Sequence, residues 1–158
     1  MTENGNGEAG EQVILLPPGG GRVYEQPGFR GLIKVDDSES GGRQCFSEWT
    51  VDPGDDGPPP HLHREHQEAF FVVAGTLVFR AGDEAIEAGA GSFVFIPPGV
   101  VHTFSNRSEA PASCVNAYVP GGIEGFFVEA GEAMASGELD GGQIERLSEK
   151  YDVFFPES

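Results

Sequence analysis

Three of the four histidines in this chain, His61, His63 and His66, lie within six residues of one another, and Glu68 follows them at the start of an apolar run. The fourth is His102. In an extended segment, residues two apart point to the same face, so His61 and His63 can reach one metal ion together. Glu68 has the opposite parity, so a bulge or turn within "REHQ" must reset the register for its carboxylate to join them.

Three imidazoles and one carboxylate are donors that suit a borderline divalent ion: Fe, Mn, Co, Ni or Zn. They leave one or two positions open on an octahedral ion, where a substrate, water or O₂ can bind. We therefore expect His61, His63, Glu68 and His102 to hold one divalent metal ion, whose identity the donor set does not fix. His66 lies in the reset segment, and we expect it to be a solvated surface residue.

The elements that must position these residues are short strands. From residue 13 to 120, apolar runs alternate with turn residues drawn from 24 glycines and 12 prolines, which is typical of a β-sandwich or β-barrel. We expect strands within 43–51, 68–88, 91–106 and 112–120. After residue 120 the apolar residues recur at helical spacing, which predicts a helix from about 123 to 136 and a second, shorter helix from about 142 to 151.

This pattern divides the chain into three parts. Residues 1–12 are polar, acidic and glycine-rich, and we expect a disordered tail there. Residues 13–120 are expected to form the barrel, and residues 121–158 a helical tail that packs on it as a lid over an exposed sheet face. The strand expected within 92–96, "SFVFI", is apolar on both faces, so either this tail or a second subunit must cover its outer side.

Two segments carry a specific resemblance. "HLHREHQEAFFVVAG" reads His61-x-His63-x4-Glu68-x6-Gly75, and "GSFVFIPPGVVHTFSN" reads Gly91-x5-Pro97-x-Gly99-x2-His102-x3-Asn106. These resemble the first and second motifs of the cupin superfamily. The first motif departs in one place, because Asp55 stands where its opening glycine is expected. Fifteen residues separate the two motifs, as in compact single-domain cupins.

The resemblance implies an all-β protein, a single-domain cupin jelly-roll β-barrel with a short C-terminal helical tail. It implies that His61, His63, Glu68 and His102 bind the metal inside the barrel. The chain is similar to small bacterial quercetinases (flavonol 2,4-dioxygenases), which implies a metal-dependent dioxygenase for an aromatic or enolic substrate and O₂. Glu68 is then the catalytic residue, either as a permanent ligand or as a mobile base that takes the substrate's hydroxyl proton.

Large aromatic residues on the predicted strands are candidates for the walls of a substrate cavity. We assign Phe46, Phe70, Phe104 and Tyr118 to substrate binding, because an aromatic lining beside an open metal position suits a flat phenolic molecule. Trp49 has the opposite parity from Phe46 in its strand, so we expect it to pack outward under the helical tail.

Composition limits the partners. Nine basic and 26 acidic residues give a net charge of −17, which disfavours nucleic acid and anionic membrane surfaces. Cys45 and Cys114 are too few for a disulfide scaffold, and no signal peptide or membrane-spanning run is evident, so we expect a cytoplasmic protein with free thiols. Dimerisation is common among cupins, and a homodimer is expected.

Two other functions remain open. The metal could act as a Lewis acid in a non-oxidative isomerase, cyclase or lyase, with Glu68 as the base. The protein could also be a non-catalytic cupin that binds a small molecule, although its ligand set is complete.

Overall fold

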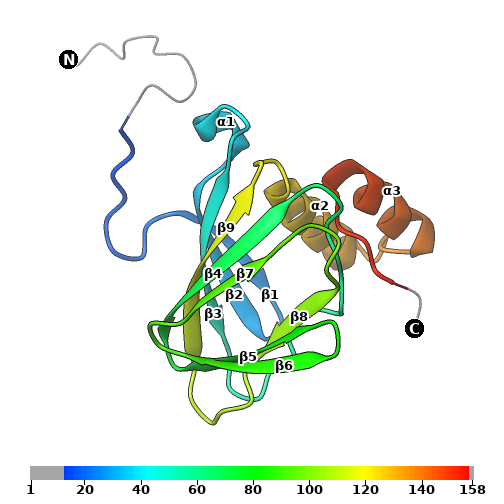
Figure 1. Ribbon diagram of the computed structural model, residues 1–158. Coiled ribbons are helices and arrows are strands. Elements are labelled where there is room, and N and C mark those ends of the chain that lie inside the picture. The colour runs from blue at the N-terminus through cyan, green and yellow to red at the C-terminus, as the bar shows by residue number, and fades with distance from the viewer. Residues whose placement is uncertain (1–12, 157–158) are drawn as a thin grey trace, which may run out of the picture.

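The structure is a computed structural model that describes residues 13–156, and the expected disordered tail at residues 1–12 lies outside this range. The described part contains nine strands and three helices (Figure 1). They are β1 (Arg22–Gln26), β2 (Phe29–Val35), α1 (Asp37–Ser40), β3 (Cys45–Val51), β4 (Gln67–Ala74), β5 (Thr76–Ala81), β6 (Glu84–Gly89), β7 (Phe93–Ile96), β8 (His102–Ser105), β9 (Ala112–Val119), α2 (Glu124–Ser136) and α3 (Gly141–Tyr151).

The strands form two antiparallel sheets. One has six strands in the order β1-β2-β3-β9-β4-β7, and the other has three in the order β6-β5-β8. The sheets curve around a common core, with the two C-terminal helices at one side of the barrel (Figure 1). The expected all-β jelly-roll barrel with short C-terminal helices is confirmed.

Alternation along β4 and β9 points one set of side chains into the barrel. Glu68 and Phe70 of β4 are buried, as are Asn116 and Tyr118 of β9. The register pairs Glu68 with Tyr118 and Phe70 with Asn116. Because directly opposed residues have neighbouring Cβ atoms, these four side chains form one patch of the inner wall.

Gly75 separates β4 from β5 as the sequence predicts. Its φ is +72°, and a Cβ added there would lie 2.8 Å from the carbonyl oxygen of Pro111. Both the backbone conformation and the close approach therefore require glycine at this turn.

Three phenylalanines fill the closed part of the barrel. Phe70, Phe79 and Phe104 contact one another with ring centroids 4.9 to 6.0 Å apart, and each is at most 7% exposed. Edge and tilted contacts of this kind add to the large apolar area that each ring buries. The three rings belong to one buried hydrophobic cluster that also contains Trp49 and Val72.

The C-terminal helices pack over one end of the barrel. Ile123, which precedes α2, is fully buried, and Phe127 of α2 contacts Trp49 and Tyr24 with ring centroids 5.2 and 5.5 Å apart. The predicted helices are thus confirmed, and α2 packs against inward-facing side chains of the six-stranded sheet. None of the helices within residues 13–156 is long and apolar enough to cross a membrane.

The parity predicted for β3 is wrong. Cys45, Ser47, Trp49 and Val51 are buried, and Phe46 points to the outer face. Both Phe46 and Trp49 are large and apolar, so the pattern alone did not fix which face turns inward. The indole is the side chain that packs among aromatic rings, and it therefore determines the orientation of the strand.

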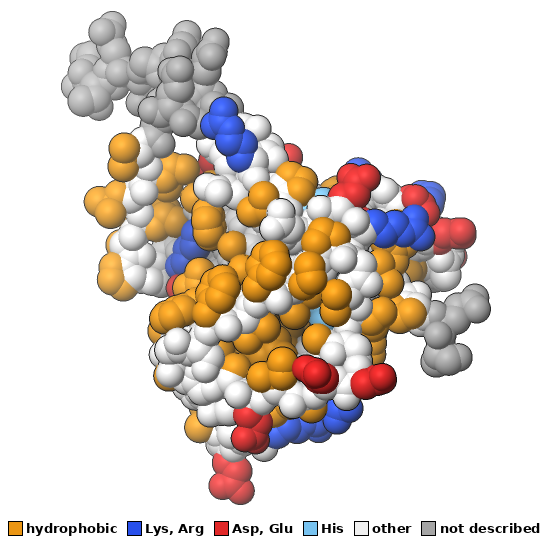
Figure 2. All heavy atoms as spheres, viewed as in Figure 1, with side chains coloured by type: hydrophobic (Ala, Val, Ile, Leu, Met, Phe, Trp, Pro, Cys, Tyr) orange, Lys and Arg blue, Asp and Glu red, His pale blue; other side chains and the backbone are white. Residues whose placement is uncertain are grey.

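The outer side of β7 and its neighbours is apolar and uncovered by the described residues. Cross-strand pairs place Phe93, Phe71 and Val115 in one row and Phe95, Ala69, Ala117 and Phe46 in the next. We call these seven residues, with Val73 and Val119, the outer apolar face. Figure 2 shows hydrophobic side chains gathered over β4 and β7.

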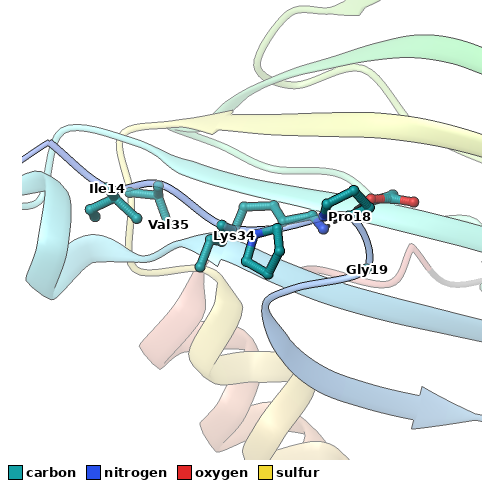
Figure 3. A pocket seen from close by; sticks show the side chains of 8 residues that line it. Ile14, Pro18, Gly19, Lys34 and Val35 are labelled. Carbon is teal, nitrogen blue, oxygen red and sulfur yellow. Dashed lines mark ion pairs between the residues drawn. The ribbon is translucent and has the colours of Figure 1, made fainter.

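A shallow hollow lies where the segment 13–20 runs past β2 and β3 (Figure 3). Lys34 anchors the segment there: its Nζ donates a hydrogen bond to the carbonyl oxygen of Gly20 at 2.6 Å and pairs with Glu48 at 2.9 Å. The hollow shares no lining residue with the cavity described below.

Candidate metal centre

Four buried side chains converge on one point inside the barrel. His61, His63, Glu68 and His102 are each at most 8% exposed, and one ligand atom from each lies within 4.8 Å of the others. The chain therefore brings together every residue that the sequence predicted as a metal ligand. Two segments that are about forty residues apart supply the set.

Backbone contacts between the two motifs bring these ligands together. His61 and His102 form an isolated antiparallel bridge, with the N–H of each donating to the carbonyl of the other at 3.0 and 2.8 Å. The N–H of Gly99 donates to the carbonyl oxygen of His63 at 2.6 Å. The Pro-Pro-Gly turn of the second motif is thus fastened to the first motif directly at the ligands.

The bend expected between His63 and Glu68 is present, and a distant residue stabilises it. The carboxylate of Asp152, just after α3, accepts hydrogen bonds from the backbone N–H groups of Arg64, Glu65 and His66 at 2.8 to 3.0 Å. The three donors would otherwise lack strand partners at this break. β4 then starts at Gln67, with Glu68 turned inward.

Each histidine ligand has its Nδ1 within hydrogen-bond distance of a backbone carbonyl oxygen. His61 Nδ1 lies 2.9 Å from the oxygen of Pro59, His102 Nδ1 lies 2.9 Å from that of Val100, and His63 Nδ1 lies 2.8 Å from that of Asp152. A carbonyl can only accept, so Nδ1 carries the hydrogen in all three rings. Nε2 is then the atom presented to the metal, an arrangement common to histidine ligands.

Glu68 is held from both sides. Its Oε2 lies 2.8 Å from His102 Nε2 and 3.3 Å from His63 Nε2, and its Oε1 accepts a hydrogen bond from Nδ2 of Asn116 at 2.7 Å. Asn116 in turn accepts from Ser47 Oγ at 3.3 Å. One carboxylate oxygen is therefore fixed by the barrel wall, and the other faces the imidazoles.

Burial and mutual contacts set the charges of this cluster. Burial, with the neighbouring imidazoles, lowers the pKa of His61 to about 4. Burial opposes ionisation of Glu68, but the hydrogen bond from His102 and the proximity of His63 hold its pKa below the usual range. Burial opposes protonation of His102, but the bond to Glu68 raises its pKa. The site therefore holds an ionised carboxylate beside a neutral His61 near neutral pH.

The chemistry of the four clustered side chains fits a metal ion. Nε2 of His63 is buried and has no hydrogen-bond partner among the described residues. A buried polar atom without a partner costs free energy, on the order of 1–3 kcal/mol, that a coordinate bond would remove. Three Nε2 atoms and one carboxylate oxygen around one point could hold a single divalent ion.

The prediction for His66 is wrong. Its side chain is only 11% exposed, and its Nδ1 lies 2.7 Å from Oδ2 of Asp152. It is not one of the clustered ligands and contacts Asp152 at the bend instead. The contact partner lies 86 residues further along the chain, so the local sequence could not indicate it.

An apolar cavity of about 630 Å³ opens directly onto the metal ligands. His61 and Glu68 contribute to its wall, and most of the remaining lining comes from the barrel strands and from the C-terminal segment, with a few residues from the loops around Pro27 and Pro58. The barrel part comprises Phe29, Trp49, Phe70, Phe104 and Tyr118, and the roof comprises Phe126, Phe127, Ala130, Met134, Leu139, Ile144, Leu147, Val153 and Phe155.

Three of the four residues predicted to bind substrate lie on this cavity: Phe70, Phe104 and Tyr118. Phe46 does not, because its strand has the opposite parity and places it on the outer apolar face. Trp49 takes the inward position instead. Burial and the nearby Glu68 raise the pKa of Tyr118 well above its usual value, so its hydroxyl stays protonated.

Sequence reasoning missed two residues that support the ligands. Asn116 is a polar residue at an inward position of a strand, between Cys114 and Tyr118, and this alternation could have revealed it. Asp152 carries no such local signal, because its role depends on where α3 ends. The helical roof was also missed as a cavity wall, although the apolar stripe of α2 is visible in the sequence.

Comparison with known proteins gives a match to a family model over part of the chain and several solved structures of the same fold. Residues 47–118 match the family model described as Cupin domain. A curated relative, the uncharacterized protein SCO3923 of Streptomyces coelicolor, is 37% identical over 54 residues, which are 34% of this chain. The aligned segment spans about half the length of that relative, 49%.

Among solved structures, KdgF from Halomonas sp. superimposes with a TM-score of 0.61 at 16% identity, over 69% of this chain and 94% of that chain. The polyketide cyclase RemF from Streptomyces resistomycificus gives a TM-score of 0.60 at 20% identity, over 68% and 80% of the two chains. These likenesses show a shared fold. The family model matches a little under half of the chain, the part that carries both motifs, and the likeness to these structures shows the fold.

Proposed function

We propose that this protein is a metal-dependent enzyme that acts on an apolar, aromatic small molecule through an oxygen atom of that molecule. The observation that carries the proposal is the position of the His61, His63, Glu68 and His102 cluster at the wall of a large apolar cavity. A sealed structural metal site would not need such a space. A cavity of this size is within the range that small-molecule sites occupy.

The cavity lining defines the substrate class. Glu68 is the only charged residue among the lining residues, and no lysine or arginine is among them. A phosphate or carboxylate substrate would therefore find no cation in the wall to pair with. Aromatic rings from both the barrel and the helices favour a flat, largely apolar molecule.

The protein's own groups have defined roles in this proposal. A divalent ion at the four ligands supplies Lewis acidity and an open position for an oxygen donor. Glu68 is ionised, and its Oε2 can accept the proton of an enolic or phenolic hydroxyl, while Asn116 holds its other oxygen in place. The apolar roof excludes water, which strengthens each polar contact inside.

The finer proposal is a dioxygenase similar to the flavonol 2,4-dioxygenases, in which O₂ is the oxidant and both of its atoms enter the product. The test uses protein loaded separately with Fe, Mn, Co or Ni, incubated with quercetin in air and under nitrogen. Loss of flavonol absorbance only in air, with ¹⁸O from ¹⁸O₂ in the product, supports it. No oxygen-dependent loss with any of the four metals contradicts it.

A non-oxidative reaction is the second candidate, and the likeness to the polyketide cyclase RemF favours it. The same apolar cavity, metal ligands and Glu68 base suit proton removal beside a carbonyl. Conversion of an aromatic polyketide under nitrogen, with the Zn-loaded protein, distinguishes this reaction from a dioxygenase. Tight binding of such molecules without any turnover would instead indicate a binding protein.

A further inference from the structure

Asp152 touches both the bend between the metal ligands and one of the ligands themselves. Its carboxylate accepts the backbone N–H groups of Arg64, Glu65 and His66, and also lies 2.7 Å from Nδ1 of His66. Its carbonyl oxygen lies 2.8 Å from Nδ1 of His63. Asp152 alone thus accepts hydrogen bonds from the backbone N–H groups of the turn and from Nδ1 of the metal ligand His63.

The three histidine ligands differ in how they are oriented. The carbonyls that hold His61 and His102 belong to Pro59 and Val100, which stand two residues before each ring. The carbonyl that holds His63 stands 89 residues away in sequence. The carbonyl contact that holds the ring of His63 is therefore supplied by the docked C-terminal segment.

The local backbone explains why this position is aspartate. Asp152 ends α3 with φ +58°, the left-handed conformation, and it is the only non-glycine residue among the described residues with positive φ. That conformation turns its side chain and its carbonyl toward the same loop. Leu62 and Phe154 then pair through two backbone hydrogen bonds, of 2.9 and 3.0 Å, which seat the segment.

The same segment also roofs the cavity. Leu147 of α3 and Val153 and Phe155 beyond it line the space above the metal ligands. The residue that orients His63 thus sits between two parts of the roof. We propose that Asp152 is a positioning residue for the metal centre, which makes the geometry and affinity of the His63 ligand depend on the docked C-terminal segment.

The test compares Asp152→Gly and Asp152→Asn with Asp140→Ala. Glycine suits the left-handed conformation and keeps the carbonyl but loses the carboxylate, and asparagine keeps the size but replaces one acceptor oxygen with a donor. Asp140 caps the other end of α3 through Gln143 N and does not contact the ligand loop, so it controls for loss of helix stability.

Cobalt(II) alone is the probe, with affinity measured by chelator competition and geometry by the visible d–d absorption. Changes to groups that orient metal ligands typically cost 10–100-fold in affinity. We expect both Asp152 variants to lose about that much and to shift the cobalt spectrum, and Asp140→Ala to stay within about twofold with the wild-type spectrum. Circular dichroism confirms that each variant is folded at the assay temperature.

Folded Asp152 variants with wild-type affinity and spectrum overturn the proposal, as does an equal loss in Asp140→Ala. The proposal rests on the metal site but not on the proposed chemistry. A wild-type protein that binds no cobalt refutes both, whereas wild-type binding without any turnover refutes only the enzyme function.

The outer apolar face supports a second, independent proposal. Phe71, Phe93 and Phe95 are 47 to 66% exposed, and Val73, Val115 and Val119 are 38 to 52% exposed. The outward positions of β4, β7 and β9 carry no charged residue in a chain of net charge −17. A contiguous apolar patch on a protein surface, rimmed by polar residues, is a feature of interaction sites.

We infer that this face packs against the same face of a second copy of the chain. Two strongly acidic copies can approach there with little repulsion, because Glu48, which is paired with Val115 across the strands, forms an ion pair with Lys34. In a two-fold arrangement each copy contributes the same face, and a stable interface buries ~800 Å² per partner. Residues 1–12 offer one large apolar side chain, Met1, and are a poor match for this face.

Sedimentation equilibrium of the full chain tests this. We expect a dimer at micromolar concentration, and Phe93→Lys with Phe95→Lys to weaken association at least 100-fold. Ile86→Lys, on the exposed part of β6, is the matched control and should not change it. A wild-type monomer at 100 micromolar, or a dimer unaffected by the double change, overturns the inference.

Discussion

Asn116 donates a hydrogen bond of 2.7 Å to one carboxylate oxygen of Glu68, and the other oxygen of Glu68 lies 2.8 Å from His102. The barrel wall thus determines which oxygen of Glu68 faces the metal. The amide also satisfies a carboxylate that is only 2% exposed.

Asn116→Ala removes that restraint. We expect metal affinity to fall about 10- to 100-fold, because Glu68 is no longer oriented. The free energy of unfolding should fall by about 1–3 kcal/mol, since a buried acceptor loses its partner. Isothermal titration calorimetry and urea denaturation measure the two effects. Ser47→Ala, one hydrogen bond further out, should have a clearly smaller effect on affinity, and an equal effect would show that Asn116 does not act through Glu68.

Metal removal should lower thermal stability. At a free metal concentration 100 times its dissociation constant, binding to the folded state contributes about 2.7 kcal/mol. For a domain of this size we expect a melting temperature lower by roughly 5–10 °C after treatment with a chelator. Differential scanning calorimetry checks this, and His102→Ala should melt at the same temperature with and without metal. A chelator effect of equal size in that variant would contradict the assigned site.

Metal affinity should rise with pH through the pKa of His102. The bond to Glu68 raises that pKa above its ordinary value, so a proton sits on His102 at mildly acidic pH and must leave when the metal binds. Below the raised pKa we expect affinity to rise about tenfold per pH unit, and to level off above it. His61, with a pKa of about 4, adds no pH dependence near neutrality.

Calorimetry in buffers of different ionisation enthalpy counts the released proton. Glu68→Gln removes the charge that raises the His102 pKa, so the sloping region should move to lower pH in that variant, alongside a weaker affinity. An affinity independent of pH between 5 and 7 in the wild type would show that His102 is not the proton carrier.

Phe127→Ala should loosen the roof without changing the metal ligands. The ring packs against Tyr24, Trp49 and Tyr118, so its loss should cost about 3 kcal/mol of unfolding free energy. Cobalt affinity should stay within about threefold, because Asp152 keeps its contacts. Phe155→Ala, at a more exposed position of the roof, should cost less than about half as much. A large loss of cobalt affinity would mean that α2 itself positions the ligands.

The sequence predicted the metal ligands because their signal is local. His61 and His63 have strand spacing, and His102 follows a turn whose proline and glycine positions are fixed, so each segment is recognisable without knowledge of the other. The bend before Glu68 was predicted from parity alone. What held the bend was not predictable, because Asp152 lies beyond two helices, and the end of a helix is the least certain feature of a sequence pattern.

Which face of a strand or helix turns toward the core was harder to predict than where the strand or helix lies in the sequence. In β3 both Phe46 and Trp49 are apolar, so either parity gives a plausible core, and the packing of Trp49 among distant aromatic rings decides between them. The same limit applies to α2, whose apolar stripe was clear but whose destination was not. It covers the barrel opening and makes the cavity wall, a position that depends on how the chain turns after residue 120.

The long-range bond between His63 and Asp152 has a consequence for synthesis. A ribosome completes all four ligands by residue 102, yet the carbonyl that orients His63 is made fifty residues later. A nascent or prematurely terminated chain that stops before α3 therefore has all four metal ligands but lacks the carbonyl that orients the ring of His63. The chain therefore reaches its full metal affinity only after α3 and Asp152 have been synthesised. Truncated products should compete poorly for scarce cellular metal.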